Sequence, residues 1–287
     1  MKKVLRKRTL AVFACLAIVL AGFAGCGNNA QTQKAADTQK TSLNVFAAAS
    51  MTESLTKAAD QYMAENPNVD VKLNFASSGT LKKQIEQGAE CDVFIAAGQK
   101  AMNGLDVNDT KVNKNGNDFI AEGTRFNILQ NEVVLVVPEN NPSKVENFDD
   151  LVADLKKGGD FKFAMGNSDV PVGQYTSKIL KHFDLDEKAL ANDGVITYAN
   201  NVKEVAEQVR SGAVDAGVVY ATDAYSQKLT KVASATKDMC GEAIYPAAIM
   251  KDTKNRQQAD DFVEFLKGNQ ASADFKEVGF IPLAQDK

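Results

Sequence analysis

Short apolar runs alternate with amphipathic helical patterns along most of the chain. The first run, 43–49 (LNVFAAA), predicts a buried strand because its apolar residues are nearly continuous. Ser50 follows it, and the pattern of 51–65 predicts a helix with one apolar face. Ser50 and Glu53 have the spacing of a capping box, so we expect Ser50 to be the N-cap of this helix.

The same junction of strand and helix recurs three times. Ser78 follows the strand predicted over 69–76, Val172 follows FKFAMGNSD, and Val202 follows the strand VITYA. The first turn of a helix has backbone N–H groups without an intrahelical acceptor and carries partial positive charge. In an open parallel sheet the carboxyl ends of the strands share one edge, where ligands bind. The four junctions therefore predict an anion site, although each Ser could instead only cap its own helix.

The order of the predicted elements indicates an α/β fold with two lobes. Strands alternate with helices, which is typical of parallel sheets covered by helices on both faces. The apolar stretch 131–142 predicts a crossing into the second lobe, and 243–250 predicts the return strand. We expect 43–128 together with 240–287 to form lobe I and 129–239 to form lobe II.

The N-terminal residues have the pattern of an export signal. Five basic residues precede the apolar run LAVFACLAIVLAGFAG, which predicts a signal peptide over 1–25. The context LAGFAGC resembles a bacterial lipoprotein signal, which implies a lipid on Cys26. An ordinary signal peptide with a chance cysteine is the alternative. The polar residues of 26–42 predict a flexible tether.

The charge of the chain excludes several classes of partner. Five of the 33 Lys and Arg residues and none of the 37 Asp and Glu residues fall in 1–25, so the remainder carries a net charge of −9. This surplus of acid argues against nucleic acid or an anionic membrane surface as a partner. A bound anion must therefore be held by local groups.

Candidate metal ligands and nucleophiles are sparse. Cys91 and Cys240 are far apart, have no metal-ligand spacing and adjoin apolar runs, so we expect small buried residues, although a disulfide stays open. His182 is the single histidine and lies on a polar helical face, where we expect it to be solvated. These residues predict no metal site.

Seven stretches, in this order, resemble the periplasmic molybdate-binding proteins that feed an ABC transporter. They are FAAASMTESL, FASSGTLKKQIEQGAECDVFIAA, NEVVLVVP, GNSDVPVGQYTSKIL, GVVYATDAYS, IYPAAIM and LKGNQASADFKEVGF, within about 43–283. The resemblance implies a bilobal type II periplasmic-binding fold, with two parallel-sheet lobes and a two-strand hinge. It also implies a binding protein rather than an enzyme, an ABC-type molybdate permease as partner, no cofactor and a monomer. The lipoprotein signal implies that this monomer is exported and anchored through Cys26 on the outer face of the cytoplasmic membrane.

The resemblance assigns five residues to the oxyanion. By motif they are Ser50 (AAAS), Ser78 (the second Ser of ASS), Val172 (before Gly in PVG), Val202 (NNVKE) and Tyr220 (VVYATDA). It implies that both serines give a hydroxyl and an N–H, both valines a backbone N–H, and the tyrosine its phenol. Val172 and Val202 could instead be plain junction residues, and Tyr220 a packed core tyrosine.

The ligand and the reaction class have alternatives. Molybdate or tungstate, doubly deprotonated, presents only acceptors and so suits a site built of donors. A protonated phosphate also needs an acceptor, and Asp169, two residues before Pro171, keeps that open. A receptor for sulfate or another tetrahedral oxyanion is the closest alternative. An exported enzyme would need a nucleophile with a base, and Ser50 has no candidate base near it in the sequence.

Overall fold

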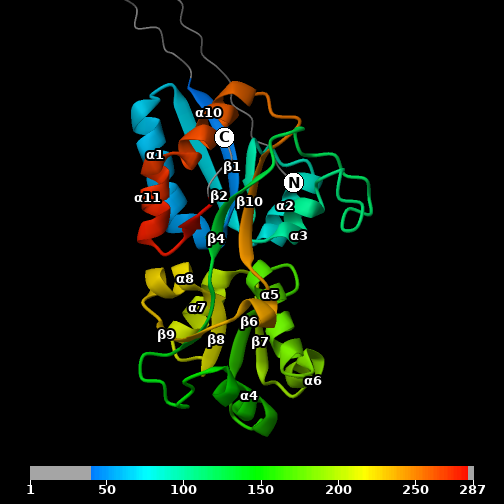
Figure 1. Ribbon diagram of the computed structural model, residues 1–287, viewed down its shortest axis with the longest axis vertical. Coiled ribbons are helices and arrows are strands. Elements are labelled where there is room, and N and C mark those ends of the chain that lie inside the picture. Colours follow the sequence, from blue (N-terminus) through cyan, green and yellow to red (C-terminus); the bar gives the residue numbers. More distant parts are fainter. Residues whose placement is uncertain (1–39, 284–287) are drawn as a thin grey trace, which may run out of the picture. The chain divides into compact units, whose positions relative to one another are not determined.

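The computed structural model describes residues 40–283, which form two β-sheets with helices packed on them (Figure 1). The predicted signal peptide, Cys26 and most of the predicted tether lie outside the described residues. Among residues 40–283, none of the helices has the length and apolar content that crossing a membrane requires.

The first sheet has six strands in the order β11-β4-β10-β3-β1-β2. Their bounds are Thr41–Ala48 (β1), Val69–Ala76 (β2), Val93–Ile95 (β3), Phe126–Asn131 (β4), Ala243–Ile249 (β10) and Ile281–Pro282 (β11). Strand β1 pairs in parallel with both β2 and β3. Its nearly continuous apolar sequence is explained by burial on both faces, since Val45 and Phe46 belong to two separate hydrophobic clusters.

The second sheet has five strands in the order β7-β6-β8-β5-β9. Their bounds are Val133–Val137 (β5), Phe163–Gly166 (β6), Ile196–Ala199 (β7), Ala216–Tyr220 (β8) and Thr230–Ser234 (β9). Strands β6, β7 and β8 run parallel, and every residue of β5 and β8 is buried.

Both sheets are mixed, so the prediction of two parallel-sheet lobes was wrong in this respect. Strand β10 is antiparallel to β3 and β4, and β5 is antiparallel to β8 and β9. The chain crosses directly from β4 into β5 and later from β9 back to β10, which Figure 1 shows as the links between the sheets. A strand that arrives from the other sheet enters at the edge where the parallel strands end, and therefore runs against them. The lobe boundaries after residues 128 and 239 stay a prediction.

Eleven α-helices of the described residues connect and cover these strands. Their bounds are Thr52–Glu65 (α1), Ser78–Glu86 (α2), Gln99–Asn103 (α3), Phe148–Lys157 (α4), Pro171–His182 (α5), Glu187–Asn192 (α6), Val202–Arg210 (α7), Ala221–Gln227 (α8), Lys237–Cys240 (α9), Arg256–Lys267 (α10) and Asn269–Glu277 (α11). Helix α7 packs through one apolar stripe. Its buried residues are Val202, Val205, Ala206 and Val209, which lie on one face of the helix.

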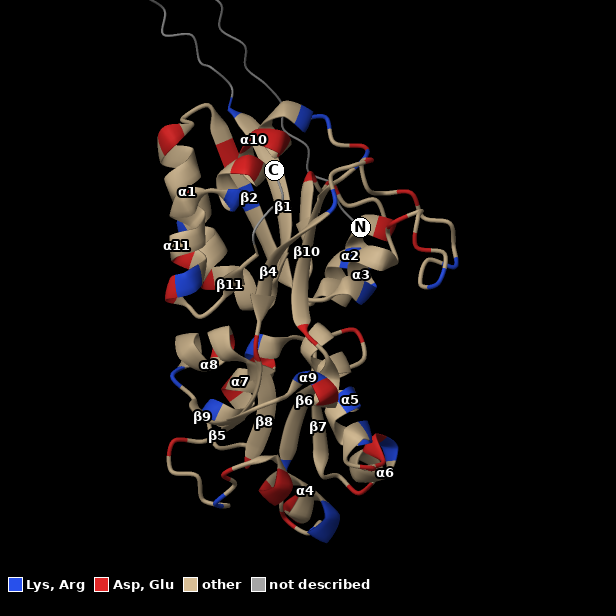
Figure 2. Cartoon of the chain, viewed as in Figure 1, with Lys and Arg blue, Asp and Glu red and all other residues tan. Residues whose placement is uncertain are grey.

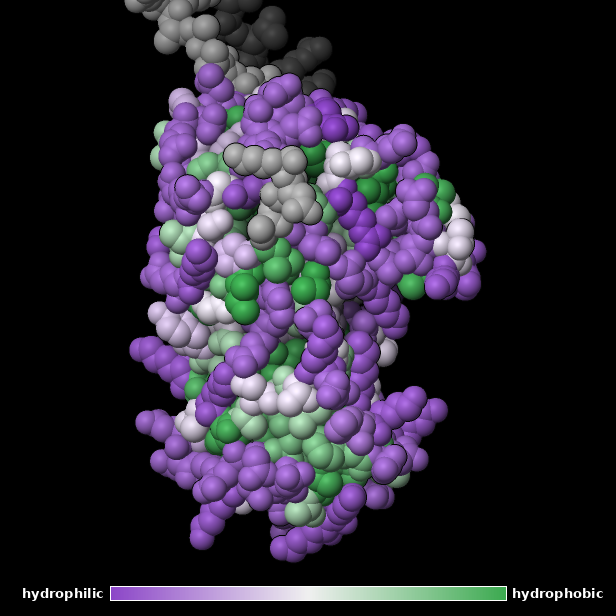
Figure 3. Space-filling model, in the orientation of Figure 1, coloured by the Kyte–Doolittle hydropathy of each residue, from purple (hydrophilic) through white to green (hydrophobic). Residues whose placement is uncertain are grey.

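Charged residues lie mainly on helices and loops, whereas the central strands carry few (Figure 2). The face in Figure 3 is largely hydrophilic with separate hydrophobic patches. Large apolar side chains that are exposed, such as Tyr198 and Tyr225, are single residues of different elements. Scattered exposure of this kind is ordinary for a folded protein.

Candidate functional site

All five residues predicted to bind the oxyanion line one cavity. The complete lining is Ala48, Ala49, Ser50, Ala76, Ser77, Ser78, Ala97, Val170, Pro171, Val172, Val202 and Tyr220. The lining comes from the ends of β1 and β2 in the first sheet and from α5, α7 and β8 around the second. Each of the five predicted residues is at most 4% exposed. Residues separated by up to 170 positions in the sequence therefore meet at one buried point.

Three helix N-termini present backbone N–H groups at this cavity. Ser78 is the first residue of α2, Val202 is the first residue of α7, and Val172 is the second residue of α5. The caps leave these amides free for a ligand, because Ser77 accepts the N–H of the third residue of α2 and Asn201 does the same for α7. Helix α5 has no side-chain cap. First-turn amides of this kind are suited to binding an anion.

The prediction that Ser50 caps a helix was wrong. Ser50 lies in a short 3₁₀ turn, Ala49–Met51, and α1 begins after it without a side-chain cap. Its hydroxyl instead forms a hydrogen bond of 2.8 Å with Tyr245 Oη. The predicted partner, Glu53, accepts hydrogen bonds from Lys203 on α7. The tight turn redirects the Ser50 side chain from its own helix to the cavity.

Ala97 connects the hydroxyls of two other predicted residues. Its backbone N–H donates to Ser78 Oγ at 2.9 Å, and its carbonyl oxygen accepts from Tyr220 Oη at 3.1 Å. Ser78 is therefore not a helix cap, since Ser77 has that role. Burial raises the pKa of Tyr220 well above 10, so the phenol keeps its proton and remains a donor at neutral pH.

The cavity is small, and its walls are uncharged. It has about 200 Å³ of empty space, including the part that opens to solvent. Among the described residues, those that line the cavity are alanines, serines, valines, one proline and one tyrosine. The geometry fits a ligand of a few heavy atoms that accepts hydrogen bonds, and it contains no acid and base pair for catalysis.

Elements of the two sheets contact each other on opposite sides of the cavity. On one side, Gly79 N donates to the carbonyl oxygen of Asp169 at 3.1 Å, and Lys83 forms an ion pair with the Asp169 carboxylate. Gly79 permits this approach, because a Cβ there would lie 2.3 Å from the same carbonyl oxygen. On the other side, Lys203 Nζ lies 2.7 Å from the Glu53 carboxylate. These contacts describe a closed cleft.

A buried carboxylate lies behind the Lys203 pair. Asp223 is fully buried, and within the described part of the chain neither of its oxygens has a hydrogen-bond partner. Lys203 Nζ is 3.5 Å from it, which is an ion-pair distance. Burial raises the pKa of Asp223 to about 7, with the Glu53 charge acting in the same direction and the Lys203 charge opposing it.

Other residues considered from the sequence lie outside the cavity. The Asp169 carboxylate is about half exposed and paired with Lys83, so it is not an acceptor within the lining. Cys91 and Cys240 are free thiols, Cys240 buried and Cys91 partly so. His182 is exposed and packs edge-on against Phe183. Within residues 40–283 no three His, Cys, Asp or Glu side chains gather as a metal site.

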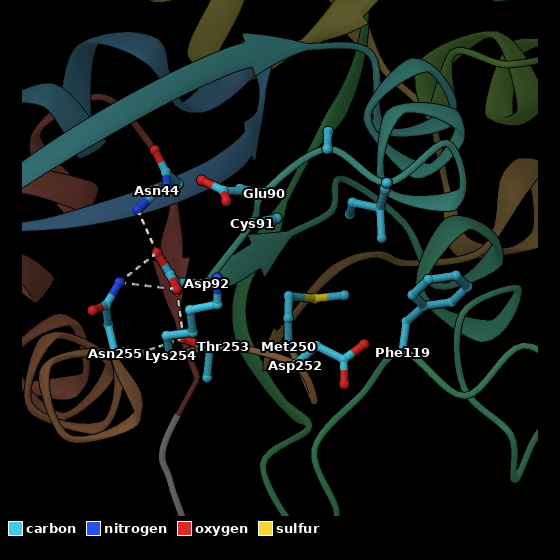
Figure 4. A pocket seen from close by; sticks show the side chains of 13 residues that line it. Asn44, Glu90, Cys91, Asp92, Phe119, Met250, Asp252, Thr253, Lys254 and Asn255 are labelled. Atoms are coloured by element: carbon cyan, nitrogen blue, oxygen red, sulfur yellow. Dashed lines mark hydrogen bonds between the residues drawn. The ribbon is translucent and has the colours of Figure 1, made fainter.

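A larger cleft lies elsewhere on the first sheet, beyond the start of β3 (Figure 4). It has about 820 Å³ of empty space, against about 200 Å³ for the first cavity on the same measure, and its charged lining residues are Glu90, Asp92, Asp252 and Lys254. The Asp92 carboxylate is engaged by Asn44 N and Thr253 Oγ1. Three carboxylates against one ammonium make this cleft unsuited to a dianion.

The sequence interpretation missed the polar side chains behind the cavity. Tyr245, Asn131 and Thr222 are all at most 3% exposed and form a hydrogen-bonded group next to Ser50. In the sequence, Tyr245 is one residue within the apolar strand predicted over 243–250. Asn131 is the polar first residue of the stretch 131–142. A tyrosine in a strand whose other residues are wholly apolar was the one available signal, since a buried phenol needs a partner.

Comparison with known proteins agrees with this geometry. Residues 43–281 match the family of bacterial extracellular solute-binding proteins. YvgL of Bacillus subtilis, assigned provisionally as an ABC transporter substrate-binding lipoprotein, is 34% identical over 96% of this chain and 98% of its own. The molybdate-binding protein ModA of Escherichia coli is 34% identical over 83% of this chain and 88% of its own. The structure of the Azotobacter vinelandii periplasmic molybdate-binding protein superposes with a TM-score of 0.71 at 26% identity, covering 85% of this chain and all of that one.

The fold is the bilobal one predicted from the sequence, and the relatives are solute-binding proteins of transporters. The chain belongs to the bacterial extracellular solute-binding proteins and, among them, to the family of the ModA molybdate-binding proteins.

Proposed function

We propose that this protein captures molybdate or tungstate outside the cytoplasmic membrane and delivers the ion to an ABC-type permease. The observation that carries the proposal is the convergence of Ser50, Ser78, Val172, Val202 and Tyr220 on one uncharged cavity of a few atoms' size. The names of the ModA relatives support the same ligand.

The chemistry of the lining favours a fully deprotonated tetrahedral ion. The hydroxyls of Ser50 and Ser78 and the first-turn amides are able to donate, and no lining side chain is a carboxylate. The phenol of Tyr220 donates to Ala97 O in the structure and would turn from it to the ion. Hydrogen bonds to a charged acceptor contribute about 1.5–3 kcal/mol each. A dianion accepts every one of them, whereas a protonated ion must also find an acceptor. The negative net charge of the chain makes this local set of donors necessary.

Capture in this proposal is a closure of two lobes without chemistry. Lobe I (43–128 with 240–287) supplies Ser50 and Ser78, and lobe II (129–239) supplies the other three binding residues. The contacts across the cleft would then form as the ion is enclosed. A monomer is sufficient, because all five groups come from one chain.

The location follows from the N-terminal sequence. We propose export by the signal of 1–25 and lipid attachment at Cys26, with 26–42 as the tether. The provisional assignment of YvgL as a lipoprotein supports this part of the proposal. Globomycin-sensitive processing and labelling with palmitate, both lost in Cys26→Ser, would test it.

Titration calorimetry of the purified protein with molybdate, tungstate, sulfate and phosphate tests the ligand. We expect tight one-to-one binding of molybdate and tungstate and no comparable binding of the other two. Preferential binding of sulfate would retain the fold and change the ligand to the alternative oxyanion. Absence of heat with all four ions, confirmed by an unchanged melting temperature, would refute the oxyanion proposal.

A further inference from the structure

A chain of buried hydrogen bonds leads from the hinge to Ser50. Asn131 is the last residue of β4, directly before the chain crosses to the second sheet. Its Nδ2 lies 3.1 Å from Tyr245 Oη, which in turn lies 2.8 Å from Ser50 Oγ. None of the three is more than 3% exposed. Water therefore does not substitute for any member, and each proton needs a definite acceptor.

The donor and acceptor roles in this series of hydrogen bonds are fixed at Asn131. The backbone N–H of Glu132 donates to Asn131 Oδ1 at 2.9 Å, and an N–H has no other option than to donate. The opposite side of the amide is therefore the NH₂ group. Its two hydrogens have two acceptors, Thr222 Oγ1 at 2.9 Å and Tyr245 Oη. An inverted amide would place two donors against each other at Glu132.

The phenol transmits this direction to Ser50. The bond of 2.8 Å between Tyr245 Oη and Ser50 Oγ can be donated from either side. Because Asn131 already donates to the phenol oxygen, donation by the phenol to Ser50 gives every hydrogen of this group an acceptor. Burial raises the pKa of Tyr245 well above 10, so this hydrogen is present at neutral pH. A buried hydroxyl left without an acceptor would be strongly disfavoured. With the phenol as the donor, the oxygen of Ser50 is occupied as an acceptor, and its hydrogen is available to the cavity that Ser50 lines.

We propose that Asn131 and Tyr245 are specificity-determining positioning residues, which hold Ser50 as a donor toward the ligand and so select a fully deprotonated oxyanion over one that must donate. The inference rests on the proposed function. A phosphate that retains a proton needs an acceptor, and Ser50 could offer one only by rotating its hydroxyl away. The phenol of Tyr245 opposes this rotation, because its hydrogen would then meet the hydrogen of Ser50.

Tyr245→Phe is the direct test, since it removes one oxygen and leaves the ring. The Ser50 hydroxyl then becomes free to turn either way. We expect the ratio of molybdate to phosphate affinity, measured by competition titration, to fall about tenfold or more, because one hydrogen bond to phosphate is gained. Asn131→Leu should shift the ratio in the same direction and serves as the second variant if the first does not fold.

Two comparisons isolate the mechanism. In a Ser50→Ala background, Tyr245→Phe should leave the ratio unchanged, since there is no hydroxyl to orient. Thr222→Val removes the other acceptor of the same amide, so it should lower the melting temperature without shifting the ratio.

An unchanged ratio in a folded Tyr245→Phe protein would overturn the inference. So would an equal shift in the Ser50→Ala background, because the phenol would then act by another route. If the wild-type protein itself binds none of these ions, the proposed function fails and the inference falls with it. That result is distinguishable from the first two, in which wild-type binding is intact.

Discussion

Replacing Ser78 by Ala separates binding from stability more clearly than any other single change. The Ser78 hydroxyl is fully buried and has two neighbours, the N–H of Ala97 at 2.9 Å and the cavity. The substitution therefore has two consequences. It leaves the Ala97 N–H without its acceptor, and it removes one donor from the ligand.

The two losses contribute to different measurements. A buried N–H without a partner costs about 1–3 kcal/mol, which lowers the stability of the ligand-free protein. The same N–H is unpaired with and without the ion, so this cost cancels in the binding free energy. The lost hydrogen bond to a dianion does not cancel. At about 1.5–3 kcal/mol it weakens binding roughly 10- to 150-fold.

Ser77→Ala is the matched control, because Ser77 lines the same cavity. Its hydroxyl caps α2 by accepting from Thr80 N and bonds to Thr80 Oγ1. Loss of an N-cap costs about 1 kcal/mol. We expect Ser77→Ala to lower the melting temperature and to change the molybdate dissociation constant little in calorimetric titration. Equal affinities of Ser78→Ala and wild type, or a larger loss in Ser77→Ala, would refute the assignment of Ser78 to the ligand.

Three further variants test other parts of the site. Tyr220→Phe removes the one phenol hydrogen, which Ala97 O accepts in the structure and which the ligand would accept once the hydroxyl turns to it. Molybdate should then dissociate at least about tenfold faster in stopped-flow displacement; an unaltered rate would contradict this. Val172→Ala retains the backbone N–H, so we expect affinity within about threefold of wild type but stability lower by about 2 kcal/mol, from titration and denaturant unfolding. The Asp223 pKa is about 7 in the folded protein against 3.8 normally, so the contribution of this carboxyl to wild-type stability should fall as pH rises between these values. Asp223→Asn should remove this loss of stability, which amounts to up to about 4 kcal/mol. If the difference in unfolding free energy between the variant and the wild type did not change with pH, the raised pKa of Asp223 would be refuted.

The sequence was sufficient to predict the junctions on which the site depends. Strand β2 and the start of α7 at Val202 are confirmed at the predicted positions. Their signals are local, because apolar runs and helix starts are set by neighbouring residues. The role of Ser78, Val172 and Tyr220 in binding stays a prediction, since it came from resemblance.

Features set by distant residues could not be read in this way. Ser50 and Glu53 have capping-box spacing, yet their partners Tyr245 and Lys203 are far away in the sequence. The antiparallel direction of β5 and β10 follows from the crossing between the sheets. An apolar run in the sequence has the same pattern whether its strand pairs in parallel or antiparallel. The orientation of Asn131 depends on one backbone N–H and becomes visible only with the fold.

Diffraction at the tungsten absorption edge, from crystals grown with tungstate, tests the central claim most directly. The account predicts one tungsten peak in the cavity, with oxygens about 2.7–3.2 Å from Ser50 Oγ, Ser78 Oγ, Tyr220 Oη and the backbone nitrogens of Val172 and Val202. A peak confined to another surface, with this cavity empty, would contradict it.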